Sequence, residues 1–430
     1  MTNSTAISEE KILSIIDLGS NSLRMIIVRI AGNRVSNVLN QVKHMVRLGE
    51  GAFESSRLQP VPMQRTLDAL KSFSGMCRSY NVVETVALAT AAVRDTHNGQ
   101  DFIDRIYREA GISFTVISGR EEARLICKGV SAALEPTSKK RMFIDIGGGS
   151  TEISVADGKN ILELESLTLG AVRLSELFPC SDVVSASMYG NVQQYIRNHA
   201  VLPLQRLKRQ SPAELIGSSG TIQNLAAMAA AMDRADGKLS ENSAEILSYK
   251  GLRRVVAALC GCREEDRKYL PGIHPRRTSI LIPGAAILQT VMEEMNISSI
   301  QVSNKGLRDG AIIDYMERMA IDPDSLSIRD DSIFRLATSC HFEEAHSRHV
   351  AKLACMLFDS AGNIGIYTGN ISTRKLLYYS AILHDIGIFI AFSKHNYHSY
   401  YLIKNTELLG FTQDEITFMA ILAFLHRYGY

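Results

Sequence analysis

Two segments of this sequence place an aspartate, glycines and hydroxyl residues in the order that phosphate-binding loops use. An apolar run precedes the segment Asp145-Ile-Gly-Gly-Gly-Ser-Thr-Glu152. It predicts a buried strand that ends at Asp145 and opens into a glycine turn. Glycine lets backbone N–H groups approach an anion closely, and successive N–H groups form a phosphate cradle. We expect Asp145 to hold a metal ion at the strand end, and Glu152 to contact that metal or a water molecule.

The same order of residues recurs near the N-terminus, where an apolar run leads to Asp17 and the sequence Leu-Gly-Ser-Asn-Ser. One such loop is a weak signal, because a tight turn needs the same residues. Two of them predict two halves that face each other across a phosphate group. A third loop, residues 217–221, precedes a predicted helix, whose N-terminal N–H groups favour anions. The candidate phosphate-binding residues are Gly19, Ser20, Asn21, Ser22, Gly147, Gly148, Gly149, Ser150, Thr151, Ser218, Ser219, Gly220 and Thr221.

Hydrolysis of a phosphate compound also needs a base for water and cations for the phosphoryl oxygens. Glu121 and Glu122 lie in the first turn of a predicted helix after a glycine, and Arg94 follows a predicted strand. Each has a plainer interpretation: acids favour the positive end of a helix, and Arg94 could form a surface salt bridge. No Ser/His/Asp or Cys/His nucleophile pattern occurs, so attack by an activated water molecule is the simpler scheme.

The elements that must position these residues alternate between strands and helices. Apolar patterning predicts strands at 12–17, 23–30, 35–42, 82–89 and 113–118, with helices at 63–80 and 101–110. A polar stretch at 136–141 follows, and the strand–turn–strand pattern restarts at Met142. Further strands are expected at about 215 and at 300–303, and the chain after about residue 330 reads as helical and rich in histidine and tyrosine. We therefore expect an α/β protein with a separate helical tail.

Bulk composition excludes several classes of protein. The chain has 430 residues and a net charge of +2, which gives no reason to expect duplex nucleic acid as a partner. Its seven cysteines show no disulfide or metal spacing, which is typical of reduced thiols in the cytoplasm. There is no signal-peptide pattern and no run of 18 apolar residues, so we expect neither a leader nor a membrane span.

Seven motifs, in order, resemble those of the exopolyphosphatase/guanosine pentaphosphate phosphohydrolase (Ppx/GppA) family. They cover roughly residues 12–315 and include the two aspartate loops, the 217–221 loop, Val46-Arg-Leu-Gly-Glu50, Thr90-Ala-Ala-Val-Arg-Asp95, Ile117-Ser-Gly-Arg-Glu-Glu-Ala-Arg124 and Gly306-Leu-Arg-Asp-Gly310. The resemblance implies two ribonuclease-H-like domains of the actin-like ATPase superfamily around a cleft. The expected boundaries are 8–135 for domain I, 136–322 for domain II and 328–430 for an all-α HD-like domain.

The resemblance also implies an activity and residue roles. The expected reaction is Mg²⁺-dependent release, with Mn²⁺ as an alternative, of terminal phosphate from polyphosphate or of the 5′ γ-phosphate from guanosine pentaphosphate. Glu121 would be the catalytic base, Glu152 would assist, and Arg94 would clamp phosphate. Asp17, Asp145 and Glu152 would serve the metal. The family further implies a cytoplasmic homodimer.

The helical tail carries a second group of candidate ligands. His346, His384 and Asp385 resemble the metal-binding residues of HD phosphohydrolases, and His395 and His426 lie farther along the tail. Neutral imidazole and carboxylate suit transition metals. Because no aspartate follows Asp414 and the helices expected after Tyr430 are absent, we expect an incomplete module that supports dimerisation and polyphosphate binding.

Two other functions remain open on the sequence. One is an ATP-binding kinase of the same superfamily, which would lack the Ser-Gly-Arg-Glu-Glu motif and would need an aspartate base for a sugar hydroxyl. The other is a non-catalytic sensor of polyphosphate or guanosine nucleotides, which would bind without releasing phosphate.

Overall fold

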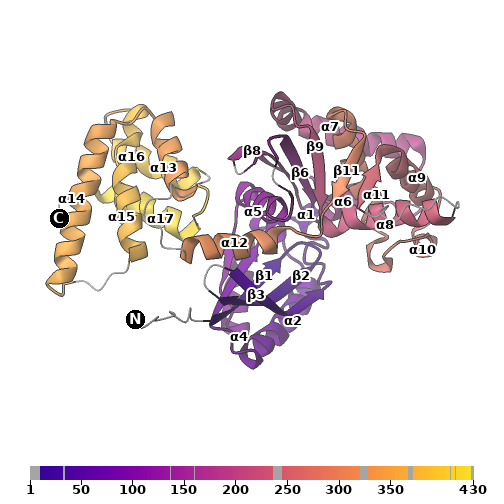
Figure 1. The fold of residues 1–430 in the computed structure, drawn as a ribbon, viewed down its shortest axis with the longest axis horizontal. Coiled ribbons are helices and arrows are strands. Elements are labelled where there is room, and N and C mark those ends of the chain that lie inside the picture. Colours follow the sequence, from indigo (N-terminus) through magenta and orange to yellow (C-terminus); the bar gives the residue numbers. More distant parts are fainter. Residues whose placement is uncertain are drawn as a thin grey trace, which may run out of the picture. The chain divides into compact units, whose positions relative to one another are not determined.

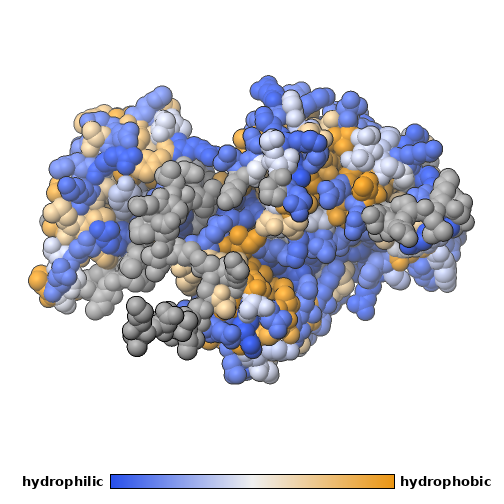
Figure 2. Space-filling view, in the orientation of Figure 1, coloured by the Kyte–Doolittle hydropathy of each residue, from blue (hydrophilic) through white to orange (hydrophobic). Residues whose placement is uncertain are grey.

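The computed structural model describes residues 10–31, 34–135, 137–158, 160–235, 245–319, 328–366, 371–406, 408–411 and 413–427. The chain divides into two compact units, Met1–Ile321 and Asp322–Tyr430. The domain boundaries expected at residues 8, 136 and 322 lie outside the described residues. No described helix is long and apolar enough to cross a bilayer. The surface of each unit in the space-filling view is mostly hydrophilic (Figure 2).

The first unit contains two mixed sheets with the same strand order. The first sheet runs β3-β2-β1-β4-β5, with β1–β3 antiparallel and β4 and β5 parallel to β1. Its strands are β1 (Glu10–Leu18), β2 (Leu23–Ala31), β3 (Arg34–His44), β4 (Glu84–Ala89) and β5 (Phe114–Val116). All five strands predicted before residue 120 are therefore present.

The second sheet repeats this order as β8-β7-β6-β9-β11, with β10 added at the edge. Its strands are β6 (Lys140–Ile146), β7 (Thr151–Asp157), β8 (Asn160–Leu167), β9 (Glu214–Ser218), β10 (Ile246–Ser248) and β11 (Ser299–Val302). Asp17 on β1 and Asp145 on β6 thus occupy equivalent places. Their cross-strand neighbours differ in charge: Asp17 lies opposite Arg24, and Asp145 lies opposite Glu152.

Helices cover both sheets and fill the space between them (Figure 1). One core packs α2 (Pro60–Ser79) and α4 (Gly99–Ala110) on the first sheet. A second core places α5 (Gly119–Ser131) and α12 (Leu307–Met319) between apolar residues of both sheets, so that the two sheets share them. A third core covers the second sheet with α6 (Ala171–Leu177), α7 (Ala186–Arg209), α8 (Ser219–Ala235), α9 (Tyr249–Cys260) and α11 (Leu281–Glu294).

Short helical turns connect these elements at α1 (Ala52–Ser55), α3 (Ala91–Arg94), α10 (Glu264–Arg267) and η1 (Pro275–Arg277). Helix α12, which we had grouped with the second domain, packs against α5 and β1. A buried charged network joins α12 to α5: Arg124 donates to Asp314 over 2.8 Å, and Lys128 and Arg318 lie within ion-pairing distance of the same carboxylate.

The second unit is all helical in its described part, as the sequence predicted. It contains α13 (Ile328–Ser339), α14 (Glu344–Asn363), α15 (Ile371–Leu383), η2 (Ile386–Phe389), α16 (His395–Asn405) and α17 (Gln413–Leu425). Its core includes Ile333, Tyr379, Ile382, Ile403 and Met419. Tyr378, Tyr379 and Tyr400 lie in or beside this core, whereas Tyr397 and Tyr401 are exposed.

Candidate active site

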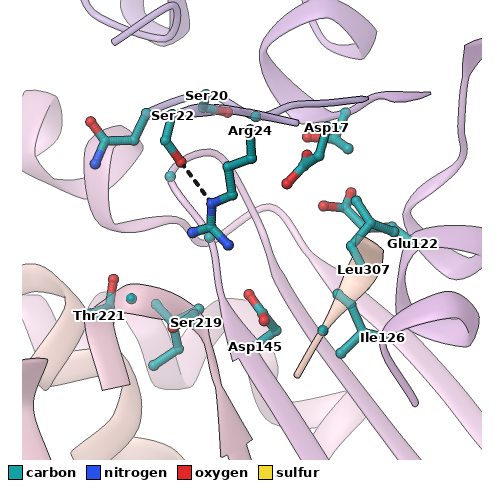
Figure 3. Close-up of a pocket in the computed structure, with 18 of the residues that line it drawn as sticks. Asp17, Ser20, Ser22, Arg24, Glu122, Ile126, Asp145, Ser219, Thr221 and Leu307 are labelled. Carbon is teal, nitrogen blue, oxygen red and sulfur yellow. Dashed lines mark hydrogen bonds between the residues drawn. The ribbon is translucent and has the colours of Figure 1, made fainter. Parts of the chain in front are cut away.

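A cleft opens between the two sheets of the first unit. The ends of β1 and β6, their glycine loops, the start of α8 and the segment before α12 line it. Carboxylates of Asp17, Glu122 and Asp145 and the guanidinium group of Arg24 face the same hollow (Figure 3). The two aspartate loops follow equivalent strands, β1 and β6, and they meet across this space.

The two aspartate loops have the same internal hydrogen bond. The N–H of Gly19 donates to the carbonyl of Ser22 over 3.1 Å, and the N–H of Gly147 donates to the carbonyl of Ser150 over 2.9 Å. This turn directs the intervening residues into the cleft. In the described part of the chain, the side-chain NH₂ of Asn21 is buried and has no hydrogen-bond acceptor. A buried donor without an acceptor is costly, so it points to a ligand.

The two loops also touch each other closely. A Cβ added at Gly149 would lie 2.6 Å from the Phe53 ring, 2.7 Å from Ala91 and 2.8 Å from the Ser20 hydroxyl. A Cβ at Gly148 would lie 2.9 Å from Cβ of Ser20. These distances are shorter than van der Waals contact, so only glycine permits the approach.

The third loop brings a cation to the same place. Residues 219–221 form the first turn of α8, and a Cβ at Gly220 would lie 2.2 Å from Nη2 of Arg277. The guanidinium group of Arg277, in η1, therefore packs against this loop and lines the cleft. Burial, followed by the nearby Arg24, lowers the pKa of Arg277 to about 10. Because this pKa lies below the usual arginine value, the nearby carboxylates do not fully balance the charge of Arg277.

Arg24 and Arg308 complete a group of three arginines that line the cleft. Within the described residues, none of the three lies within ion-pairing distance of a carboxylate. Burial and then the mutual repulsion with Arg24 lower the pKa of Arg308. Burial followed by the same three arginines lowers the pKa of Lys43 to about 8. Such uncompensated positive charge is suited to a polyanion.

The three predicted metal-binding carboxylates fall into two positions. Asp17 and Asp145 line the cleft, and burial raises the pKa of each. The hydroxyl of Ser218 donates to Oδ2 of Asp145. Glu152 lies behind the lining on β7, where Ser166 donates to it over 2.9 Å, and where burial and then Glu122 raise its pKa. The three do not form a ready cluster of ligand atoms in the described part of the chain.

Of the predicted phosphate-binding residues, two do not line the cleft. The hydroxyl of Thr151 donates to the carbonyl of Leu169 over 2.5 Å, and Ser218 is occupied by Asp145. The others do line it: Gly19, Ser20, Asn21, Ser22, Gly147, Gly148, Gly149, Ser150, Ser219, Gly220 and Thr221.

The structure corrects the placement of Glu121. Its carboxylate accepts two hydrogen bonds from Arg124, at 2.7 and 2.8 Å, in the buried network with Asp314. The next residue, Glu122, points into the cleft instead, because successive helical positions face about 100° apart. Burial raises the pKa of Glu122 to about 7, against the opposing effect of Arg94 and with a smaller contribution from Asp17. An acid with such a pKa is suited to take a proton from water near neutral pH.

Arg94 also lies in a different environment from the one expected. It does not line the cleft; its Nη1 donates to the carbonyl of Ile117 over 3.0 Å and to Glu122 over 3.2 Å. Its Nε lies 3.3 Å from Asp95. Arg94 therefore holds the Glu122 side chain in place, and the guanidinium groups that line the cleft are those of Arg24, Arg277 and Arg308.

Sequence reasoning missed Glu122, Arg24, Arg277 and Arg308 as cleft residues. Glu122 and Arg308 lie inside motifs that the sequence had singled out, but a motif does not say which of two adjacent side chains faces inward. Arg24 could have been found from the hairpin itself, since it stands opposite Asp17 as Glu152 stands opposite Asp145.

In the second unit, the structure brings His346, His384 and Asp385 together as predicted, and it adds His395 and His426 to them. Ligand atoms of the first three lie within 4.8 Å of one another, and so do those of Asp385, His395 and His426.

Comparison with known proteins agrees with this architecture. The chain is 28% identical to the guanosine-5′-triphosphate,3′-diphosphate pyrophosphatase of Vibrio vulnificus over 96% of this chain and 80% of that protein. It superposes on an exopolyphosphatase of Cytophaga hutchinsonii with a TM-score of 0.66 at 28% identity, covering 72% of this chain and 98% of the other. A Ppx/GppA protein of Aquifex aeolicus matches with a TM-score of 0.60 at 24% identity, over 73% of this chain and 100% of the other.

Two family models cover most of the chain. The Ppx/GppA phosphatase family matches residues 26–319, and domain III of the Ppx/GppA phosphatases matches residues 328–429. The predicted family and the predicted fold, two actin-like domains with a helical C-terminal domain, are thereby confirmed. With its paired glycine loops, cleft carboxylates and helical second unit, this chain belongs to the Ppx/GppA phosphatase family.

Proposed function

We propose that this phosphatase releases the terminal phosphate of inorganic polyphosphate, the 5′ γ-phosphate of guanosine pentaphosphate, or both. The observation that supports it best is that Glu122 lines the same cleft as three arginines. In the described part of the chain these arginines have no carboxylate within ion-pairing distance. Similarity to an exopolyphosphatase and to a guanosine pentaphosphatase supports the same substrate classes.

Glu122 acts as the general base in this scheme. Its carboxylate takes a proton from the attacking water, while Arg94 keeps the side chain oriented. The buried carboxylates of Glu152 and Glu122 repel each other, and this repulsion adds to the effect of burial in raising the pKa of Glu152. Glu152 thereby assists by favouring the protonated form of the pair. We thus move the base from Glu121 to Glu122 and treat Arg94 as a positioning residue.

The loops and arginines hold the substrate. The N–H groups of the glycine turns and the Asn21 amide donate to phosphate oxygens, and Arg24, Arg277 and Arg308 balance their charge. Phosphoryl transfer passes through a loose transition state, so positioning and charge neutralisation supply most of the catalysis.

The acids at the strand ends suit a divalent cation, and we propose Mg²⁺, with Mn²⁺ as an alternative. Asp17 and Asp145 would hold it, because the cleft lining offers carboxylate and hydroxyl oxygens and neither imidazole nor thiol. Mg²⁺ usually binds one or two carboxylates and completes its shell with water and substrate phosphate, which explains why no finished cluster is needed beforehand. The bound ion would neutralise charge on the phosphate groups.

The test is phosphate release from purified protein with long-chain polyphosphate, guanosine pentaphosphate and ATP, each with and without Mg²⁺. Release from one of the first two, lost in Glu122→Gln, supports the proposal and defines the preference. Binding without release points to a sensor, and transfer of the ATP γ-phosphate to a sugar points to a kinase.

Two further expectations accompany this function. We propose that the enzyme acts in the cytoplasm as a homodimer, on the basis of the family resemblance. Light scattering on the purified chain tests the dimer, and a monomer at micromolar concentration would contradict it.

A further inference from the structure

The second unit contains a compact cluster of imidazoles around one carboxylate. Nε2 of His346 and of His384 lie 3.6 and 3.3 Å from Oδ2 of Asp385. Nε2 of His395 and of His426 lie 3.0 and 3.3 Å from Oδ1 of the same residue. These five residues come from α14, the α15–η2 junction, the start of α16 and the end of α17.

Hydrogen bonds to the main chain fix the tautomers of three of these imidazoles. Nδ1 of His384, His395 and His426 lies 2.8, 3.0 and 2.6 Å from the carbonyl oxygen three residues earlier in each case. A carbonyl only accepts, so each Nδ1 carries a proton, and each ring in its neutral form offers a lone pair at Nε2. Arg427 also lies 3.5 Å from Nδ1 of His395, but this longer contact is the weaker of the two.

This arrangement directs lone pairs at one another. The Nε2 atoms of His395 and His426 are 3.1 Å apart, and both face Oδ1 of Asp385. That oxygen is buried and has no hydrogen-bond donor of acceptable geometry within the described residues. In the neutral tautomers these acceptors converge on one point, and they repel each other unless a proton or a metal cation lies between them.

The spacing fits a metal ion. Four ligands placed tetrahedrally about 2.0–2.1 Å from an ion are about 3.3 Å from one another. The separations within the group of Asp385, His395 and His426 are 3.0, 3.1 and 3.3 Å. The fixed Nδ1–H groups match the outer contacts that orient metal-binding histidines in proteins.

We propose that the helical unit binds a divalent transition-metal ion of the Zn²⁺ or Fe²⁺ type at Asp385. His395 and His426 bind on the Oδ1 side, and His346 and His384 on the Oδ2 side, so the carboxylate is shared by two three-ligand groups. Imidazole-rich ligand sets favour such ions over Mg²⁺. Metal bound at the two groups ties α14, the α15–η2 junction, α16 and the residue after α17 together, and its binding stabilises this unit.

The surroundings of the cluster are closely packed. His384 and His395 are each only 6% exposed. The N–H of Gly387 donates to the Ser399 hydroxyl over 2.9 Å, and a Cβ at Gly387 would lie 2.1 Å from the carbonyl of His395. Close packing of η2 on α16 therefore keeps the ligands in place before the ion arrives.

The experiment is a Co²⁺ titration of the full chain, followed by visible absorption and by metal analysis after Zn²⁺ loading. Mg²⁺ in large excess is present throughout, so that the oxygen-lined cleft of the first unit is occupied. The variants are Asp385→Asn, His395→Ala and His426→Ala. His349→Ala is the matched control, because His349 is exposed on α14 and lies outside the cluster.

We expect one or two equivalents of bound metal, and an affinity that falls at least about tenfold in each cluster variant, the loss that even outer-shell changes cause. His349→Ala should bind normally. Binding at the wild-type level in Asp385→Asn, or no bound metal in the wild type, overturns the proposal and leaves a cluster that only shares protons. If a variant fails to fold by circular dichroism, the wild type decides: Zn²⁺ added after EDTA dialysis must raise its melting temperature.

Discussion

Replacing Glu122 by Gln removes the proposed base while keeping the size and shape of the side chain. A general base usually contributes about 10²–10⁴ to the rate, which corresponds to about 2.7–5.4 kcal/mol of activation free energy. We expect kcat to fall by that factor. Arg94 keeps its hydrogen bond to the carbonyl of Ile117, so the fold should survive.

The pH dependence gives an independent measure of the same group. A base works only when deprotonated, and burial raises the pKa of Glu122 from 4.5 to about 7. The acid limb of kcat/KM, which reports the free enzyme, should therefore lie near pH 7. At pH 5 only about 1% of the base would be ionised, so kcat/KM should be roughly 100-fold below its value at pH 8. An unperturbed glutamate would put this limb near 4.5.

Glu121→Gln is the matched control, because it is the adjacent residue with the same change. Its carboxylate belongs to the buried network with Arg124 and Asp314, so the variant should lose stability but keep its rate within about threefold once folded. The assay is steady-state phosphate release at pH 5–9, with thermal melting alongside. The reasoning fails if folded Glu121→Gln loses as much activity as Glu122→Gln, or if the acid limb stays in the Glu122→Gln variant.

Three further perturbations test the cleft and its support. Arg308→Ala removes a cation that faces the substrate and should raise KM roughly 10- to 100-fold, the value of a charged hydrogen bond, while Arg105→Ala, in an exposed pair on α4, should not. Gly149→Ala forces a methyl group to within 2.6–2.8 Å of three neighbours and should lower kcat/KM at least about tenfold; Gly190→Ala, with open space around it, should leave kcat/KM unchanged and add about 1 kcal/mol of stability. Burial raises the pKa of Asp314, but the cations around it outweigh burial and hold that pKa well below 3.8, so its stabilising effect is full above pH 3.8 and is lost as the pH falls through the folded pKa. Asp314→Asn should lower the free energy of unfolding at pH 7 by about 3–5 kcal/mol and therefore lower the melting temperature. The variant should lose less stability than the wild type on acidification. Equal melting temperatures at pH 7 would contradict the network.

The local sequence was enough to place most strands and the glycine loops that line the cleft. Apolar runs followed by aspartate and glycine restrict the backbone so strongly that the β1 and β6 turns could be predicted directly. The repeat of this pattern also predicted two facing halves. The shared strand order of the two sheets has the same cause, since each half begins with the same hairpin.

The local sequence could not decide which side chains face the cleft. Glu121 and Glu122 are adjacent and chemically alike, and only the packing of α5 between the two sheets sends one toward Arg124 and the other toward the cleft. The pairing of Arg94 with Glu122 was hidden for the same reason, because the two lie on separate elements.

The sequence by itself determined the family, the paired glycine loops and the helical character of the tail, because these depend on short segments whose backbone preferences are strong. The tertiary structure decided which glutamate faces the cleft, which three arginines line it, and the five-residue cluster at Asp385. Each of these depends on side chains from distant elements meeting at one point, and that meeting is fixed by the packing of sheets and helices rather than by the spacing of residues along the chain.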